Sequence, residues 1–285
     1  MKITAVIPAR AGSKGIPNKN IRLVNNRPLI YYAIDNAKKS RFITDIIVST
    51  DSPEIEVIAR QMGVSVKRRD KCLCGDAVTL DAVIYDAVKD IACDYVVTMQ
   101  PTSPTLKSDT LDRAIEYAIH NSLDTVISVI NRPHLSWREE NGVKIPNYEK
   151  RLNRQYLPPN YMETGAFVIS DKKIVTESTR IGKTVDVYPV SEEEAVDIDS
   201  FADLLYADTV LQSKKIAIYV NGNNTRGIGH IYRALELADE FYSKPDIYYD
   251  TNQTDVKVFG TTTHNLIGVN GIAELYSILK EKQYD

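Results

Sequence analysis

The sequence predicts an α/β protein with a mostly parallel sheet and helices on both faces. Three observations support this fold class. Short apolar runs, each long enough for one buried strand, recur along the first half of the chain. Segments with helical spacing of apolar residues lie between those runs, and polar side chains follow several runs directly. This alternation is typical of parallel sheets, which bind ligands beyond the carboxyl ends of their strands.

The first strand is expected at residues 3–8, followed by a loop rich in glycine and basic residues and a helix from Pro28 to Ala37. α/β proteins bind phosphate with such an arrangement, because glycine lets the backbone approach the oxygens and Lys and Arg supply charge. The loop has neither Walker A spacing nor a clean G-x-G-x-x-G fingerprint. A solvated basic turn is therefore an alternative. The loop residues of interest are Arg10, Gly12, Ser13, Lys14, Gly15, Lys19 and Asn20.

The next elements follow in order along the chain. A strand at 45–51 precedes a helix with Ser52 as N-cap, Pro53 in the first position and Gly63 at its end. Thr79 is placed to cap a later helix, whose apolar residues keep helical spacing. The remaining elements expected in this half are strands at 64–67, 95–99 and 125–130 and helices at 80–92 and 108–121.

The regular pattern stops at residues 131–163, which hold several prolines and little helical period. We expect an inserted arm there, because long stretches without clear structure in a compact domain are usually functional or form an interface. A strand at 165–170 and a helix at 200–212 complete a first domain over residues 1–213. Residues 214–285 begin again with strand, glycine-rich loop and helix, which predicts a smaller α/β unit.

Composition excludes several classes of function. The hydrophobic share of 43% and charged share of 26% are ordinary for a soluble protein. The net charge of −3 implies no general attraction to nucleic acid or to an anionic membrane. No apolar run approaches the length of a membrane span, and no signal-peptide pattern follows Met1. Cys72, Cys74 and Cys93 form no disulfide framework, so we expect a reducing cytoplasm.

Two carboxylates near the end of the first domain predict a metal site. Asp197 and Asp199 are two residues apart, so in an extended chain both point to one side while Val196 and Ile198 point to the other. Adjacent carboxylates repel unless a cation lies between them or one is protonated. Mg²⁺ suits such a pair, because it binds carboxylates together with substrate phosphates and retains waters. The alternative is a solvated pair in which Asp199 or Ser200 only caps a helix.

Arg10, Arg69 and Gln100 each follow a predicted strand, so all three are expected at one edge of the sheet. Together with the acidic pair, they predict a site for a nucleoside triphosphate with Mg²⁺. The sequence has no P-loop or kinase motif, which favours attack at the α-phosphate with loss of pyrophosphate. In-line positioning and neutralisation of phosphate charge carry the catalysis in that chemistry.

Four motifs occur in order along the first domain: IPARAGSKG with Lys19-Asn20, QPTSP from Gln100, a looser RQ-x-LP from Arg154, and VDID from Val196. Together they resemble the motifs of acylneuraminate cytidylyltransferases, also called CMP-sialic acid synthetases, over about residues 1–212. The resemblance implies a Rossmann-like nucleotidyltransferase fold and a homodimer formed through the arm. CMP-KDO synthetases are less similar, because their first loop lacks GSKG followed by Lys-Asn.

The resemblance implies transfer of a cytidylyl group from CTP to the anomeric hydroxyl of a nine-carbon 2-keto sugar acid, with Mg²⁺ or alternatively Mn²⁺. It implies that Arg10, Ser13, Lys14 and Lys19 hold the triphosphate, Asn20 contacts the cytidine, Arg69 and Thr79 help to bind the nucleotide, and Asp197 and Asp199 bind the metal. Gln100 would lie where sugar and nucleotide meet, and Arg154 of the partner subunit would contact the sugar carboxylate. The implied catalytic residues are Arg10, Lys19, Gln100 and Asp199.

Three departures from the family pattern leave the sugar open. Some members have Lys near the position of Ser136 and Tyr near that of Val168, and Glu163-Thr164-Gly165 stands where Asn-Gly is common. N-acetylneuraminate, a deaminated sialic acid, legionaminate and pseudaminate are therefore alternatives.

In the second unit, Gly227-Ile228-Gly229-His230, with Arg233 a turn later, is similar to the first loop of a UDP-sugar hydrolase of the pseudaminate pathway, of the GT-B class. This implies a partial GT-B-like segment over 214–285, too short for a complete cleft, so function is expected in the first domain. A nucleotide-sugar hydrolase and a non-catalytic nucleotide-sugar binding protein are the alternative functions. UDP-sugar hydrolysis without use of CTP would favour the first, and CTP binding without pyrophosphate release the second.

Overall fold

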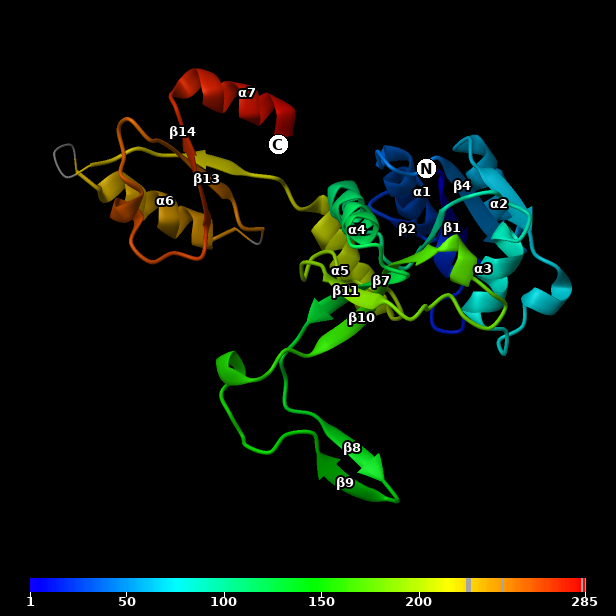
Figure 1. The fold of residues 1–285 in the computed structure, drawn as a ribbon. Coiled ribbons are helices and arrows are strands. Elements are labelled where there is room, and N and C mark those ends of the chain that lie inside the picture. Colours follow the sequence, from blue (N-terminus) through cyan, green and yellow to red (C-terminus); the bar gives the residue numbers. More distant parts are fainter. Residues whose placement is uncertain (224–226, 242, 283, 285) are drawn as a thin grey trace. The chain divides into compact units, whose positions relative to one another are not determined.

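The computed structural model describes residues 1–223, 227–241, 243–282 and 284. The chain forms two compact units, Met1–Leu211 and Gln212–Asp285 (Figure 1). Each unit has its own sheet and its own hydrophobic core. Within the described residues, no helix combines the length and the apolar character needed to cross a membrane.

A seven-stranded sheet forms the centre of the larger unit, in the order β11-β7-β10-β6-β1-β4-β5. Only β10 is antiparallel to its neighbours, so the other six of the seven strands share one direction. The predicted mostly parallel α/β sheet is confirmed. The strands are β1 (Ile3–Pro8), β4 (Asp45–Thr50), β5 (Ser65–Arg68), β6 (Tyr95–Met99), β7 (Thr125–Asn131), β10 (Tyr161–Asp171) and β11 (Val185–Pro189).

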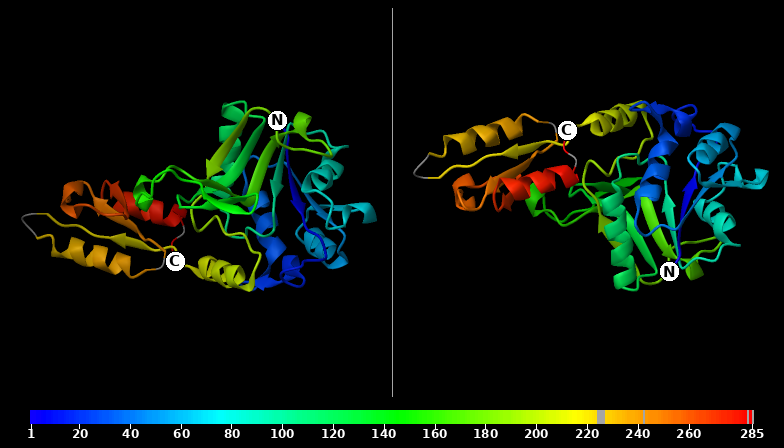
Figure 2. Two further views of the ribbon diagram at one scale, coloured as in Figure 1. Left: turned by 90° about the horizontal axis from the view of Figure 1, so that it is seen from below. Right: turned by 90° about the horizontal axis from the view of Figure 1, so that it is seen from above.

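Helices cover both faces of this sheet, as its alternating side chains require (Figure 2). Ile3, Ala5 and Ile7 of β1 belong to a core cluster with residues of α1, α2 and α4. Val6, which points the other way, packs with Ile84 and other residues of α3. The helices are α1 (Leu29–Lys39), α2 (Pro53–Gln61), α3 (Leu80–Val88), α4 (Ser108–His120) and α5 (Phe201–Gln212).

Two predicted helix caps are present. The Ser52 hydroxyl accepts a hydrogen bond from the backbone N–H of Ile55 at 3.3 Å, at the start of α2. The Thr79 hydroxyl accepts one from the backbone N–H of Ala82 at 3.4 Å, at the start of α3. Helix α3 ends at Val88 rather than at the predicted residue 92, because the chain turns there toward β6.

Two short hairpins lie outside the main sheet. In the arm, β8 pairs with β9 around a turn at Asn141 and Gly142, both of which have positive φ. The arm also carries a 3-10 helix at Arg154–Tyr156, so it is partly ordered rather than a uniform loop. The second hairpin, β2 with β3, precedes α1. These strands are β2 (Leu23–Val24), β3 (Arg27–Pro28), β8 (Trp137–Glu140) and β9 (Val143–Pro146).

Strand β10 is longer than the predicted 165–170 and is irregular where it approaches the candidate site. Its register with β7 shifts between Glu163 and Val168. Gly165 lies within this irregularity and has a φ of 71°, a backbone conformation that other residues rarely adopt. The bulge therefore places a glycine at the edge of the site.

The smaller unit has a parallel three-stranded sheet, β12-β13-β14, with one helix on each face. Ile247 of β13 packs with α6, whereas Tyr248 packs with Leu275 of α7. The glycine-rich loop predicted after the first strand of this unit lies partly outside the described residues. The elements are β12 (Ala217–Tyr219), α6 (Gly229–Asp239), β13 (Asp246–Asp250), β14 (Asn265–Val269) and α7 (Ile272–Lys282).

Candidate functional site

A cavity of about 330 Å³ opens at the carboxyl ends of β1 and β6. Pro8 at the end of β1 and Pro101 after β6 form part of its wall. Segments that are distant in the sequence meet there, at the edge of the sheet where this fold class places ligands. The sequence-predicted residues in the wall are Arg10, Ser13, Lys19, Asn20, Arg69 and Gln100.

The N-terminal loop is anchored to the body of the unit. The backbone N–H of Ala11 donates to Asp51 Oδ1 at 2.8 Å, and Asn20 Nδ2 donates to the carbonyl of Arg10 at 3.0 Å. Ile16 is fully buried in a cluster with residues of α1 and α5. The basic side chains therefore extend from a fixed backbone, which does not fit a solvated turn.

Lys19 joins this loop to the acidic segment 196–199. Its Nζ donates to the carbonyl of Ile198 at 2.6 Å and lies 3.0 Å from Asp199 Oδ1. The Lys19 side chain is only 13% exposed, so this contact is not a chance surface pair. The backbone N–H of Ile198 in turn donates to the carbonyl of Thr102 at 2.9 Å, which ties the segment to the chain after β6.

The acidic segment alternates as its sequence predicts. Val196 and Ile198 are buried, whereas Asp197 and Asp199 are accessible to solvent. Ser200, rather than Asp199, caps α5: its backbone N–H donates to Asp203 Oδ2 at 2.7 Å, and its hydroxyl accepts from the N–H of Asp203 at 3.3 Å. The Asp199 carboxylate is therefore not used as the helix cap.

Asp197 lies close to Gln100 and Gly165. A Cβ atom built on Gly165 would lie 2.9 Å from Gln100 Nε2 and 3.5 Å from Asp197 Oδ2. Burial raises the pKa of Asp197, and the nearby Asp199 charge adds to this effect, although a hydrogen bond from Thr102 opposes it. Asp197 keeps contact with solvent, so its carboxylate is only partly buried and does not belong to a core.

The acidic pair fits a divalent cation. Its two carboxylates share one side of the chain, and the crowding around Asp197 makes an added positive charge favourable. The part of the chain that the structure describes has no group of three or more His, Cys, Asp or Glu side chains arranged for a metal. A pair of carboxylates would fill only part of the octahedral shell of Mg²⁺, and its other positions would be open to other oxygen donors.

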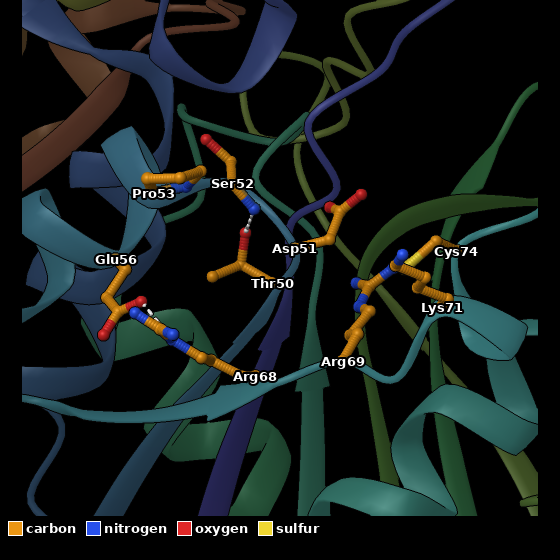
Figure 3. A pocket seen from close by; sticks show the side chains of 9 residues that line it. All are labelled: Thr50, Asp51, Ser52, Pro53, Glu56, Arg68, Arg69, Lys71 and Cys74. Carbon is orange, nitrogen blue, oxygen red and sulfur yellow. Dashed lines mark hydrogen bonds and ion pairs between the residues drawn. The ribbon is translucent and has the colours of Figure 1, made fainter.

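Arg69 lies between this cavity and a neighbouring one of about 450 Å³ (Figure 3). Its Nε donates to the Ser49 hydroxyl and its Nη2 to the Ser49 carbonyl, each at 3.0 Å. Burial lowers the pKa of the Arg69 guanidinium. Figure 3 shows Arg69 and Asp51 on one side of the second cavity and the Glu56–Arg68 ion pair on the other. Arg69 is thus a positive charge held in place by backbone and hydroxyl groups.

A family model described as cytidylyltransferase matches residues 4–249. The chain belongs to the cytidylyltransferase family. The family resemblance that the four motifs carry is thereby confirmed.

N-acylneuraminate cytidylyltransferases are among the similar proteins. The enzyme from Escherichia coli O18:K1:H7 (strain RS218 / NMEC) is 30% identical over 301 residues, which cover 99% of this chain and 70% of that protein. The enzyme from Streptococcus agalactiae serotype V is 29% identical over 314 residues, which cover 98% of this chain and 75% of that protein. Alignments with two further streptococcal relatives span 52% of those proteins.

A CMP:2-keto-3-deoxy-manno-octonic acid synthetase in complex with CTP shares the fold of this cytidylyltransferase. Its TM-score is 0.59 at 14% identity, over 74% of this chain and 98% of that chain, and this likeness concerns the fold alone. The two sequence alignments above cover 98 and 99% of the chain, and so include most of the smaller unit. They do not favour a UDP-sugar hydrolase, whose resemblance in that unit stays a prediction.

Five predicted site residues of the cytidylyltransferase stand outside the cavity wall. Thr79 caps α3 between two residues that line the cavity, and Arg154 is exposed on the arm. Lys14 extends toward solvent and lies 2.9 Å from Asp76 Oδ2. Asp197 and Asp199 are next to the wall through their neighbours Gln100 and Lys19.

Three wall residues with polar side chains were not predicted from the sequence. Thr102 lies inside the QPTSP motif, so the motif itself could have indicated it. Cys74 and Asp76 come from the loop between β5 and α3, which has no strand or helix pattern. Their contribution depends on a loop that folds back over the cavity, which spacing alone does not show.

Gly15 approaches the acidic segment too closely for a side chain. A Cβ atom built there would lie 2.6 Å from the carbonyl oxygen of Asp199. We expect Gly15→Ala to displace the segment from Lys19 and to lower kcat/KM for CTP about a hundredfold, because catalysis is sensitive to displacements of about 1 Å. Steady-state kinetics of pyrophosphate release measure this. Gly229→Ala, in the smaller unit, is the control, because a Cβ there also meets no atom within 4 Å; it should leave kcat/KM near that of wild type, and equal losses in both variants would contradict the contact.

Proposed function

We infer that this cytidylyltransferase transfers a cytidylyl group from CTP to a nine-carbon 2-keto sugar acid of the sialic acid type, giving the CMP-sugar and pyrophosphate. One observation carries the proposal: Lys19 connects the basic N-terminal loop and the Asp197–Asp199 segment at a cavity that Gln100 also lines. A triphosphate needs cations and a metal site at the same place. The named relatives supply the sugar class.

The residues divide by the part of the substrate that they would contact. Arg10, Lys14 and Lys19 would neutralise the triphosphate, and the Ser13 hydroxyl would donate a hydrogen bond to it. Asn20 would contact the cytidine, and Arg69 and Thr79 would help to bind the nucleotide. Gln100 would orient the sugar hydroxyl, since its amide lies beside Gly165 and Asp197. The hydroxyl attacks the α-phosphorus in line, one P–O bond forms, the bond to the β-phosphate breaks, and pyrophosphate and a proton are released.

Mg²⁺, with Mn²⁺ as the alternative, is the cofactor that the acidic pair would hold. Asp197 and Asp199 would be its protein ligands, together with phosphate oxygens of CTP. When bound, the ion would neutralise phosphate charge and orient the leaving group. Support comes from the alternation of buried and solvent-accessible side chains along the acidic segment, and from the position of Asp197, which is partly buried beside the Asp199 carboxylate.

The arm would form a homodimer and bring Arg154 to the partner's sugar site. Apolar side chains on the arm are unusually exposed, among them Trp137 at 56% and Tyr156 at 69%. Sedimentation analysis tests this, and a monomer at the concentrations of the assay would contradict it. The compartment we expect is the cytoplasm, in keeping with the free cysteines Cys72, Cys74 and Cys93.

Pyrophosphate release with CTP and a panel of sugar acids tests the function. N-acetylneuraminate, a deaminated sialic acid, legionaminate and pseudaminate are the panel, and release should depend on one of them and on CTP. Mass spectrometry should detect the CMP-sugar in an amount equal to that of the released pyrophosphate. CTP binding without pyrophosphate release would instead indicate a nucleotide-sugar binding protein, and hydrolysis of a UDP-sugar without CTP a hydrolase.

A further inference from the structure

Asp76 bridges two of the basic side chains of the N-terminal loop. Arg10 Nη1 lies 2.6 Å from Asp76 Oδ1, and Lys14 Nζ lies 2.9 Å from Asp76 Oδ2. One carboxylate thus uses both of its oxygens on two cations. These contacts hold the pKa of the Asp76 carboxyl below its usual range, so it is negatively charged at neutral pH. The bridge is solvent-accessible, with 53% of the Asp76 side chain exposed.

The carboxylate belongs to a loop that forms one wall of the cavity. Leu73, Cys74, Gly75 and Val78 line the cavity along with Asp76. Backbone hydrogen bonds within the loop stabilise its conformation: the N–H of Leu73 donates to the Asp70 carbonyl, and the N–H of Val78 donates to the Gly75 carbonyl. The tip that carries Asp76 reaches across to the N-terminal loop through side chains alone, and such contacts can break without unfolding α3 or β5.

A phosphate group and a carboxylate place oxygen acceptors around Arg and Lys in similar ways. Arg10 and Lys14 are cations that the proposed function assigns to the triphosphate. A phosphate group that binds both cations therefore competes with the Asp76 carboxylate for the same two positive charges. Two negative groups cannot share these cations without repulsion.

We propose that Asp76 is an internal counter-anion, which CTP displaces from Arg10 and Lys14 and which returns to them as pyrophosphate leaves. The inference rests on the proposed function for the identity of its ligands. It assigns Asp76 a role in setting phosphate affinity and product release, not in the chemical step. The carboxylate holds Arg10 and Lys14 together at the rim of the cavity, and pyrophosphate must displace it to bind them, so pyrophosphate binds more weakly than it would to the two cations alone.

Asp76→Asn tests this role, because the amide keeps the size of the side chain but removes its charge and replaces one of its two acceptor oxygens by a donor. Asp70→Asn is the matched control: it removes the same charge from the same loop, and the Asp70 side chain makes no capping bond and does not line the cavity. Titration calorimetry with pyrophosphate alone gives the affinity of each full-length variant. Pyrophosphate inhibition against CTP gives the same quantity under turnover.

Asp76→Asn should tighten pyrophosphate binding about three- to tenfold, the size expected for exposed charge pairs, and Asp70→Asn should stay close to wild type. Raising the ionic strength should reduce the difference in pyrophosphate affinity between Asp76→Asn and wild type, since salt screens exposed charges. Weaker pyrophosphate binding in Asp76→Asn would overturn the proposal and make Asp76 a support for Arg10. Equal changes in both variants would also overturn it. Failure of the proposed function would be distinguishable, because the wild-type protein would then release no pyrophosphate from CTP.

Discussion

Replacing Asp197 by Asn should lower turnover by about a hundred- to a thousandfold, the range for loss of one group that stabilises charge in the transition state. Asp199→Asn should behave alike, since both carboxylates would hold the same ion. Folding should change little: both side chains are accessible to solvent, and the Lys19–Asp199 pair has one partner that is 80% exposed. Pyrophosphate release at saturating CTP and Mg²⁺ measures turnover, and thermal unfolding measures stability.

Glu192→Gln is the matched control for these two variants. Glu192 is exposed, lies a few residues before the acidic segment and carries the same charge, but it does not line the cavity. Its removal should leave turnover near that of wild type. If both aspartate variants kept wild-type turnover with Mg²⁺ present, the metal assignment would be wrong.

Gly165→Ala should damage both the site and the fold. The φ of 71° at this position is strained for alanine, and its Cβ would lie 2.9 Å from Gln100 Nε2. The backbone strain should cost about 1–3 kcal/mol in the free energy of unfolding. The displaced Gln100 amide should also lower kcat/KM for the sugar by about a hundredfold, because it would no longer orient the attacking hydroxyl.

Gly63→Ala is the control that introduces backbone strain without a steric contact to a site residue. Gly63 has nearly the same φ, 72°, but a Cβ there meets no atom within 4 Å. We expect a comparable loss of stability and unchanged activity. Chemical denaturation and steady-state kinetics on both variants make the comparison. A Gly165→Ala enzyme with wild-type kcat/KM would show that Gln100 does not need its present position.

The parts of the fold with strong local patterns were predictable. Buried runs such as 3–8 and 95–99 gave the central strands, and the Ser52 and Thr79 caps located two helices. Strand direction was not predictable, so β10 as the antiparallel member of the sheet came from the structure. The edge strand β11 was missed because its side chains are only half-buried, which leaves no apolar run.

Site residues were predictable where chemistry and position coincide. Arg10 and Gln100 follow strands and carry groups suited to phosphate and hydroxyl, and both line the cavity. The Asp76 bridge could not be predicted, because Arg10 and Asp76 are 66 positions apart and the sequence of the loop that carries Asp76 has no strand or helix pattern. The closeness of Gly15 to Asp199 was hidden for the same reason.

The N-terminal loop and the acidic segment should bind the same ligand. Calorimetry is the most direct check of this, by measuring the affinity for CTP of wild type and Asp197→Asn, each with Mg²⁺ and with EDTA. Wild type should bind CTP, and Mg²⁺ should tighten that binding about tenfold or more, whereas Asp197→Asn should lose most of the gain. The same Mg²⁺ dependence in both proteins, or no binding of CTP to wild type, would contradict a shared site.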